Sequence, residues 1–141
     1  MKEGEATSNV IRLALATILA HALVVAVHSA AHQILGVQAS PTQLLFIVTV
    51  IIIAPPLACI LLWKGPNVSG AVLLACSMAG ALVFGVYNHF VAISPDHISH
   101  VSRMSPTSWS IIFQATALLL AITEGFGIYA GLAILKRSRS K

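Results

Sequence analysis

Four long apolar stretches constrain the fold of this chain most. They cover residues 10–35, 43–63, 69–93 and 109–135, and short polar or proline-containing segments separate them. Each is long enough to cross the roughly 30 Å hydrocarbon core of a bilayer as an α-helix, which takes about 20 residues. The chain is 57% hydrophobic and only 9% charged, too few charges for the surface of a water-soluble domain. We therefore predict an all-α integral membrane protein whose single domain is a small bundle of four transmembrane helices.

The distribution of Lys and Arg predicts the orientation of this bundle. Basic residues close to helix ends are retained on the cytoplasmic side of a membrane. In a four-helix topology one side of the membrane receives the basic residues of both chain ends and of the second loop, which are Lys2, Arg12, Lys64, Lys136, Arg137, Arg139 and Lys141. We therefore predict a multi-pass protein of the cell membrane, an inner membrane in bacteria, with both termini cytoplasmic (N-in/C-in).

The net charge of +4 has a plain use in such a protein. A basic tail directly after a membrane-spanning helix marks the inner face and contacts anionic lipid headgroups. The bilayer is therefore the expected partner, and no nucleic-acid binding is predicted.

Histidines gather near the predicted outer ends of the helices. At 1.5 Å per residue, His28, His89 and Gln114 come out about 6–8 Å below the outer boundary. His32 lies one turn above His28 on the same helix face, because residues four apart are neighbours on a helix. One predicted layer therefore receives polar side chains from the first, third and fourth helices.

The loop after the third helix adds a second group of candidate ligands. The segment "DHISH" places Asp96, His97 and His100 directly above the layer, and "HSAAH" in the first helix has the HxxxH spacing. Neutral imidazole is a common ligand of copper, zinc, iron and nickel, which need three or four donors at about 2.0–2.2 Å. The two motifs together predict a transition-metal site on the extracytoplasmic side. Its candidate ligands are His28, His32, His89, Asp96, His97 and His100, with Gln114 as a donor to a ligand.

Two ionisable residues are predicted deeper in the membrane. His21 and Glu124 come out about 18–22 Å from the outer boundary. An ionised carboxylate at this depth costs at least a few kcal/mol, so Glu124 is expected to be paired, protonated or in contact with water. His21 is the expected partner, because it lies on the face of the first helix that carries His28. The pair predicts a proton path below the metal.

A pair of prolines interrupts the second helix. Pro55 and Pro56 lack N–H donors, which frees the carbonyls of Ile51 and Ile52. Such breaks are tolerated in a membrane where protein or water satisfies the freed groups. A polar neighbour is expected at this position.

Four classes of function are compatible with these features. The leading interpretation is a membrane protein that binds a transition metal for metal handling or redox chemistry. The alternatives are a proton-coupled small carrier that uses Glu124 and His21, an electron-transfer subunit with haem between His28 and His89, and a structural or accessory subunit. A homo-oligomer or a larger membrane complex is compatible with all four. The sequence has no nucleophile elbow, phosphate loop or cofactor fingerprint that would identify an enzyme.

Overall fold

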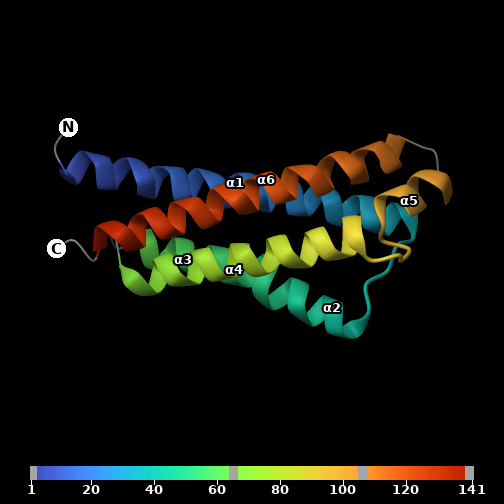
Figure 1. Ribbon diagram of the computed structural model, residues 1–141, viewed down its shortest axis with the longest axis horizontal. Helices are drawn as coiled ribbons and strands as arrows, with labels where there is room; N and C mark the ends of the chain where they lie inside the picture. Colours follow the sequence, from blue (N-terminus) through green and yellow to red (C-terminus); the bar gives the residue numbers. More distant parts are fainter. Residues whose placement is uncertain (1–2, 64–66, 105–107, 139–141) are drawn as a thin grey trace.

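The structure, a computed structural model, describes residues 3–63, 67–104 and 108–138, and every regular element within them is helical. The order along the chain is shown in Figure 1. The elements are α1 (Glu3–Leu35), α2 (Pro41–Phe46), the π-helix η1 (Ile47–Ile53), α3 (Ala54–Trp63), α4 (Val68–Val86), the π-helix η2 (Tyr87–Val91), α5 (Ile98–Met104) and α6 (Ser108–Ser138).

Within the described residues, four helical segments are long and apolar enough to cross a membrane, which confirms that part of the prediction. They are Ser8–Leu35, Pro41–Trp63, Val68–Val91 and Ser108–Ser138. The second span is one continuous stretch made of α2, η1 and α3, and the third joins α4 to η2. The short helix α5 lies in a segment for which the sequence predicted a loop. Of the basic residues used to predict orientation, Lys2, Lys64, Arg139 and Lys141 lie outside the described residues.

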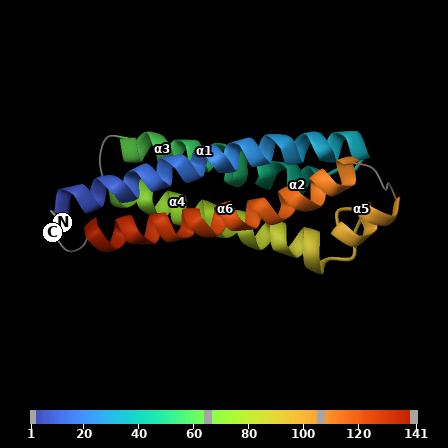
Figure 2. The same ribbon diagram turned by 90° about the horizontal axis from the view of Figure 1, so that it is seen from above.

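The long helix α6 lies at the centre of the arrangement. It packs along both α1 and α4, and α3 packs against α4. Figure 1 and Figure 2 show both chain termini at one end of the molecule and α5 at the other. We call these the termini end and the histidine end. Toward the histidine end α2 diverges from α1 (Figure 1).

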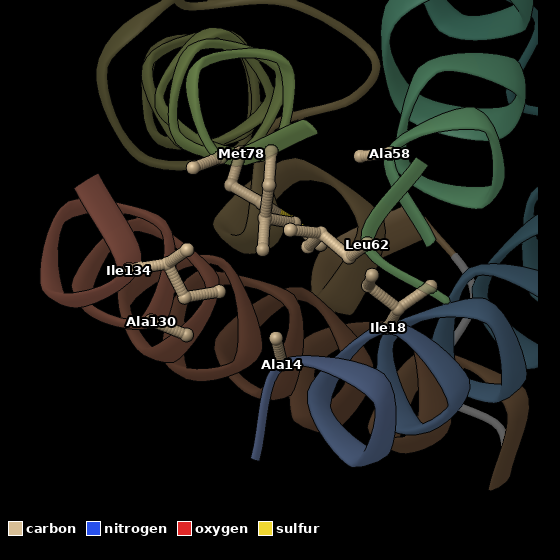
Figure 3. Packing of buried hydrophobic residues seen from close by; sticks show 9 residues of the cluster. Ala14, Ile18, Ala58, Leu62, Met78, Ala130 and Ile134 are labelled. Atoms are coloured by element: carbon tan, nitrogen blue, oxygen red, sulfur yellow. The ribbon is translucent and has the colours of Figure 1, made fainter. Parts of the chain in front are cut away.

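The termini half of the molecule holds an apolar core built from all four spans. Figure 3 shows its side chains pointing toward one another from α1, α3, α4 and α6. Its buried members are Ala14, Ile18, Ala58, Leu62, Ala71, Leu74, Met78, Ala130 and Ile134. The small residues in this set let the helix backbones approach closely, which favours helix association in lipid.

Polar contacts attach α2 to the third span. Ser40 and Gln43 form a capping box, in which the Ser40 hydroxyl accepts the Gln43 N–H at 3.3 Å and the Gln43 side chain accepts the Ser40 N–H at 2.8 Å. The Gln43 amide also donates to Asn88 of η2 at 3.0 Å. The rings of Phe46 and Phe84 stack with their centroids 4.9 Å apart. The start of the second span is therefore held against α4 and η2.

The π-helix η1 ends at the two prolines. The N–H of Ala54 bonds to the carbonyl of Thr49, five residues earlier. The carbonyl of Ile51 has no helical partner in either register, because Pro55 is the residue four positions later and Pro56 the residue five positions later. His21 of α1 lies beside this carbonyl. It is the polar neighbour expected at the break.

Candidate metal centre

Three histidines from two spans bring their Nε2 atoms together at the histidine end. Nε2 of His28 lies 3.2 Å from Nε2 of His89 and 3.1 Å from Nε2 of His32. One ligand atom from each of the three lies within 4.8 Å of the other two. His28 and His89 are 6% and 5% exposed, and the His32 side chain is 19% exposed. The HxxxH spacing in α1 explains why two of the rings meet, and the end of η2 supplies the third.

The hydrogen bonds of Thr116 determine the tautomer of His28. Thr116 in α6 donates its hydroxyl hydrogen to a backbone carbonyl, that of Ile112 at 2.7 Å or of Phe113 at 3.0 Å. Its oxygen, 2.8 Å from Nδ1 of His28, is therefore left to accept from that ring nitrogen. In a neutral imidazole only one nitrogen carries hydrogen, so a protonated Nδ1 leaves a lone pair on Nε2 of His28.

The end of α1 orients His32 in the same way. Gly36 adopts a left-handed conformation with φ +68°, a common way for a helix to end. The next residue, Val37, donates its N–H to the carbonyl of His32 at 3.0 Å, and its own carbonyl lies 3.1 Å from Nδ1 of His32. A carbonyl can only accept, so Nδ1 is again the protonated nitrogen and Nε2 of His32 carries the lone pair.

Asp96 orients the third ring. Nδ1 of His89 lies 3.2 Å from the backbone carbonyl of Asp96 and 3.3 Å from its carboxylate Oδ1. The carbonyl accepts the Nδ1–H and the carboxylate adds negative charge beside it, which leaves the lone pair of His89 on Nε2. Burial raises the pKa of Asp96, but the interaction with the His89 N–H and attraction to the three histidines outweigh it, so the pKa lies below its ordinary value. Asp96 is therefore a carboxylate at neutral pH.

The three hydrogen bonds have one common consequence. Each Nδ1 donates to oxygen, so three Nε2 lone pairs point into one small region, where neutral rings have no hydrogen to share. Oδ1 of Asp96 adds negative charge 3.3 Å from Nε2 of His32. Lone pairs and a carboxylate that converge without a donor repel one another unless a cation lies between them.

An aromatic ring supports the cluster from behind. Phe113 of α6 is fully buried, and its ring centroid lies 4.8 Å from that of His28, 5.0 Å from His32 and 5.4 Å from His89. The sequence reasoning did not name it. Its spacing could have identified it, because Phe113 and Thr116 are three residues apart in a helix and share a face.

The remaining predicted ligands lie elsewhere. His97 precedes α5 and its Nδ1 accepts the N–H of Ser99 at 3.2 Å, and His100 is exposed on α5. Neither belongs to the group of mutually close ligand atoms. Gln114 donates to the hydroxyl of Ser102 and so links α6 to α5 rather than to a histidine of the cluster. Thr116, and not Gln114, is the side chain of α6 that forms a hydrogen bond with a histidine of the cluster.

The two deeper residues lie on different surfaces below the cluster. His21 is 1% exposed, and its Nδ1 lies 3.3 Å from the hydroxyl of Thr123. Glu124 is 2% exposed and lines a cavity that also borders the three histidines and Asp96. Among the described residues no hydrogen bond or ion pair joins His21 to Glu124, and Glu124 lines the cavity that borders the three histidines.

Comparison of the chain with protein-family models, with curated proteins and with solved structures finds no match.

Proposed function

We propose that this chain is a membrane protein that binds one transition-metal ion through Nε2 of His28, His32 and His89. The observation that carries the proposal is the set of three Nδ1–H donors, each held by an oxygen acceptor, with three lone pairs facing one point. Metal-binding histidines typically donate their other ring nitrogen to a carbonyl or carboxylate in this way. A proton at that point would satisfy two of the nitrogens, whereas a metal ion satisfies all three.

The spacing of the donors supports a first-row metal. Ligands at 2.0–2.1 Å in a tetrahedral arrangement lie about 3.3 Å from one another. The two measured Nε2 separations, 3.2 Å and 3.1 Å, are close to that edge length. Imidazole donors suit copper, zinc, iron and nickel. Asp96 holds the His89 ring, and the cavity leaves a further coordination position accessible, as in catalytic rather than structural metal sites.

The same distances argue against haem as the occupant. Two imidazoles on opposite sides of one iron place their nitrogens about 4 Å apart, twice an ordinary metal–nitrogen bond. Nε2 of His28 and of His89 are 3.2 Å apart, with no space for a porphyrin between them. A single small ion fits this pair of rings better.

We further propose that the four apolar helices cross the cell membrane with both termini in the cytoplasm. Lys136 and Arg137 in the last turn of α6 lie at the termini end, and the metal centre lies at the opposite end. Retention of basic residues in the cytoplasm would then place the metal centre on the extracytoplasmic side. Accessibility of a cysteine introduced at exposed His100 to an impermeant thiol reagent in intact cells tests this orientation, and labelling only after cell lysis would reverse it.

Metal analysis of the detergent-purified protein tests the proposed function. After replenishment with copper, zinc, iron or nickel in separate samples, the wild type should retain one ion per chain. A His28→Ala/His89→Ala variant should retain none, because one remaining imidazole does not hold a metal ion against dialysis.

A His97→Ala/His100→Ala variant is the matched control, since it removes the same number of histidines outside the cluster. It should retain one ion per chain. Absence of metal from the wild type after replenishment, or equal retention in both double variants, would reject the metal site.

A further inference from the structure

The cavity beside the metal centre has a polar boundary at each of two ends. It encloses about 400 Å³, within the range of small-molecule sites. The three histidines and Asp96 line it, and so does Glu124, which lies about 12 Å farther along α6 than Thr116 beside His28. The rest of the lining is mainly apolar, with Val25, Ile47, Ile51, Phe84 and Leu120 among its members, and it also includes Ser29 and the amides of Gln33, Gln38 and Gln43. A ligand of matching shape would carry polar atoms at two separate points.

Glu124 presents a carboxyl group without a protein partner to this cavity. It is 2% exposed, and no described residue forms a hydrogen bond or an ion pair with it. Side chains of a helix lean toward its N-terminus, so the Glu124 carboxyl points along α6 toward the histidine end. It interacts electrostatically with His89 of η2, while η1 on the opposite wall carries no titratable side chain. A buried carboxyl without a partner is costly in a membrane, which makes a ligand hydroxyl a favourable neighbour.

The cavity opens sideways between the first and second spans. Among the described residues, α1 packs on α6 and α3, and it makes few contacts with α2 and η1. Ser29 and Gln33 on α1 and Leu44 on α2 line the cavity and are exposed. In a bilayer this opening would face lipid chains. The opening therefore gives a lipid-soluble ligand a route from the membrane into the cavity.

We propose that this cavity binds a lipid-soluble quinol, with one oxygen at the open position of the metal and the other hydroxyl donating to Glu124. The apolar tail would leave through the opening between α1 and α2. This inference rests on the proposed metal site and names the ligand class that the site would take. An aliphatic alcohol would share the tail and a hydroxyl, but it would reach only one of the two polar ends.

Calorimetric titration of the metal-loaded protein in lipid nanodiscs under argon, with decylubiquinol and 1-decanol as probes, tests the inference. Decylubiquinol should bind saturably and at least tenfold more tightly than 1-decanol, which carries the same ten-carbon chain and one oxygen. Glu124→Leu should weaken decylubiquinol binding by about tenfold, through loss of one hydrogen bond to an ionisable group. Metal content should stay unchanged, because Glu124 is not a ligand.

Two glycine variants provide a matched pair. A Cβ at Gly85 would meet only Cδ2 of His89, at 4.0 Å, and Gly85 lines the cavity. The side chain of Gly85→Leu therefore extends into the cavity and should block the binding of decylubiquinol. A Cβ at Gly125 meets nothing within 4 Å and this residue does not line the cavity, so Gly125→Leu should bind as the wild type does.

Metal content measured on the same samples separates the two proposals. Loss of metal from the wild type would reject the metal site. Metal-loaded protein that binds decylubiquinol no better than 1-decanol, or that is insensitive to both Glu124→Leu and Gly85→Leu, would overturn the quinol inference alone.

Discussion

The two halves of the molecule differ in how their helices meet. In the termini half, small residues bring α4 and α6 so close that a Cβ on Gly131 would lie 2.9 Å from the carbonyl oxygen of Ala71 and from backbone and side-chain atoms of Ala75. In the histidine half, two π-helices border a cavity of about 400 Å³, and polar side chains bridge the spans. The first half is packed for stability, whereas the second leaves space for a ligand.

One helix belongs to both halves. The part of α6 in the termini half carries the glycines that contact α4. The part in the histidine half carries Phe113 and Thr116, which lie beside the histidine cluster. The comparison therefore predicts that substitutions in the termini half change stability, whereas substitutions in the histidine half change metal affinity.

Gly131→Ala should have the largest effect. The added methyl group meets backbone atoms of α4, which cannot move aside as a side-chain end can, so α6 must shift away. We expect a loss of about 3 kcal/mol in stability, at the upper end for overpacking. Thermal unfolding in detergent, followed by circular dichroism, measures it.

The control for this variant is Gly125→Ala, whose methyl group enters open space on the same helix. It should change stability by less than about 0.5 kcal/mol. Equal destabilisation by the two variants would show that the contact with α4 does not set the effect, because the higher helix propensity of alanine favours both variants equally.

Thr116→Val should have the next largest effect, and on metal affinity. Valine keeps the shape of the side chain but removes the oxygen that accepts from Nδ1 of His28. Loss of such a supporting hydrogen bond typically weakens metal binding by about 10-fold to 100-fold, and we expect about 30-fold within this range. Competition with a chromogenic chelator measures the affinity. A variant with wild-type affinity would mean that the ring is oriented by packing on Phe113 alone.

Asp96→Asn should weaken metal binding by about tenfold, because an amide supports His89 less well than a carboxylate does. Protons compete with the metal for imidazole, so affinity falls as the pH drops. The pKa of Asp96 lies below its ordinary value, so this carboxylate stays charged in weak acid and its contribution disappears only in stronger acid.

Chelator titrations over a pH series test this assignment. The curves for the wild type and Asp96→Asn should run parallel near neutrality, offset by the tenfold difference. Convergence of the two curves between neutral pH and about pH 6 would show that Asp96 gains its proton together with the histidines, contrary to its lowered pKa.

The sequence predicted the helices and part of the metal centre for identifiable reasons. Apolar length alone revealed four spans, and the i, i+4 spacing of His28 and His32 fixed their common face. Counting residues from the predicted helix ends placed His89 at the level of His28, and their Nε2 atoms lie 3.2 Å apart. These predictions needed only the regular geometry of a helix.

What the sequence could not predict depends on irregular backbone and on three-dimensional packing. The carbonyl of Val37 reaches His32 because Gly36 turns the chain, and no side-chain pattern encodes that contact. His97 and His100 have a favourable spacing, but His97 accepts the N–H of Ser99, His100 is exposed on α5, and neither joins the cluster. The cavity lies where α2 diverges from α1, and the hydropathy of the sequence does not predict this divergence.

Gly127→Ala should have the smallest effect. It tests whether the distance to the neighbouring atoms or their rigidity determines the loss of stability at the contact between α4 and α6. Its added methyl group would lie nearer to its neighbour than the one at Gly131, 2.5 Å from Cγ of Met78. That neighbour is a flexible side chain, and methionine adapts to irregular gaps. We therefore expect a cost of about 1 kcal/mol, with metal affinity unchanged. The combination Gly127→Ala/Met78→Leu should not recover this stability, because branched leucine adapts less well. A loss of stability equal to that of Gly131→Ala would show that the distance to the neighbouring atom alone sets the effect. It would also show that the flexible Met78 side chain cannot move aside in the termini half.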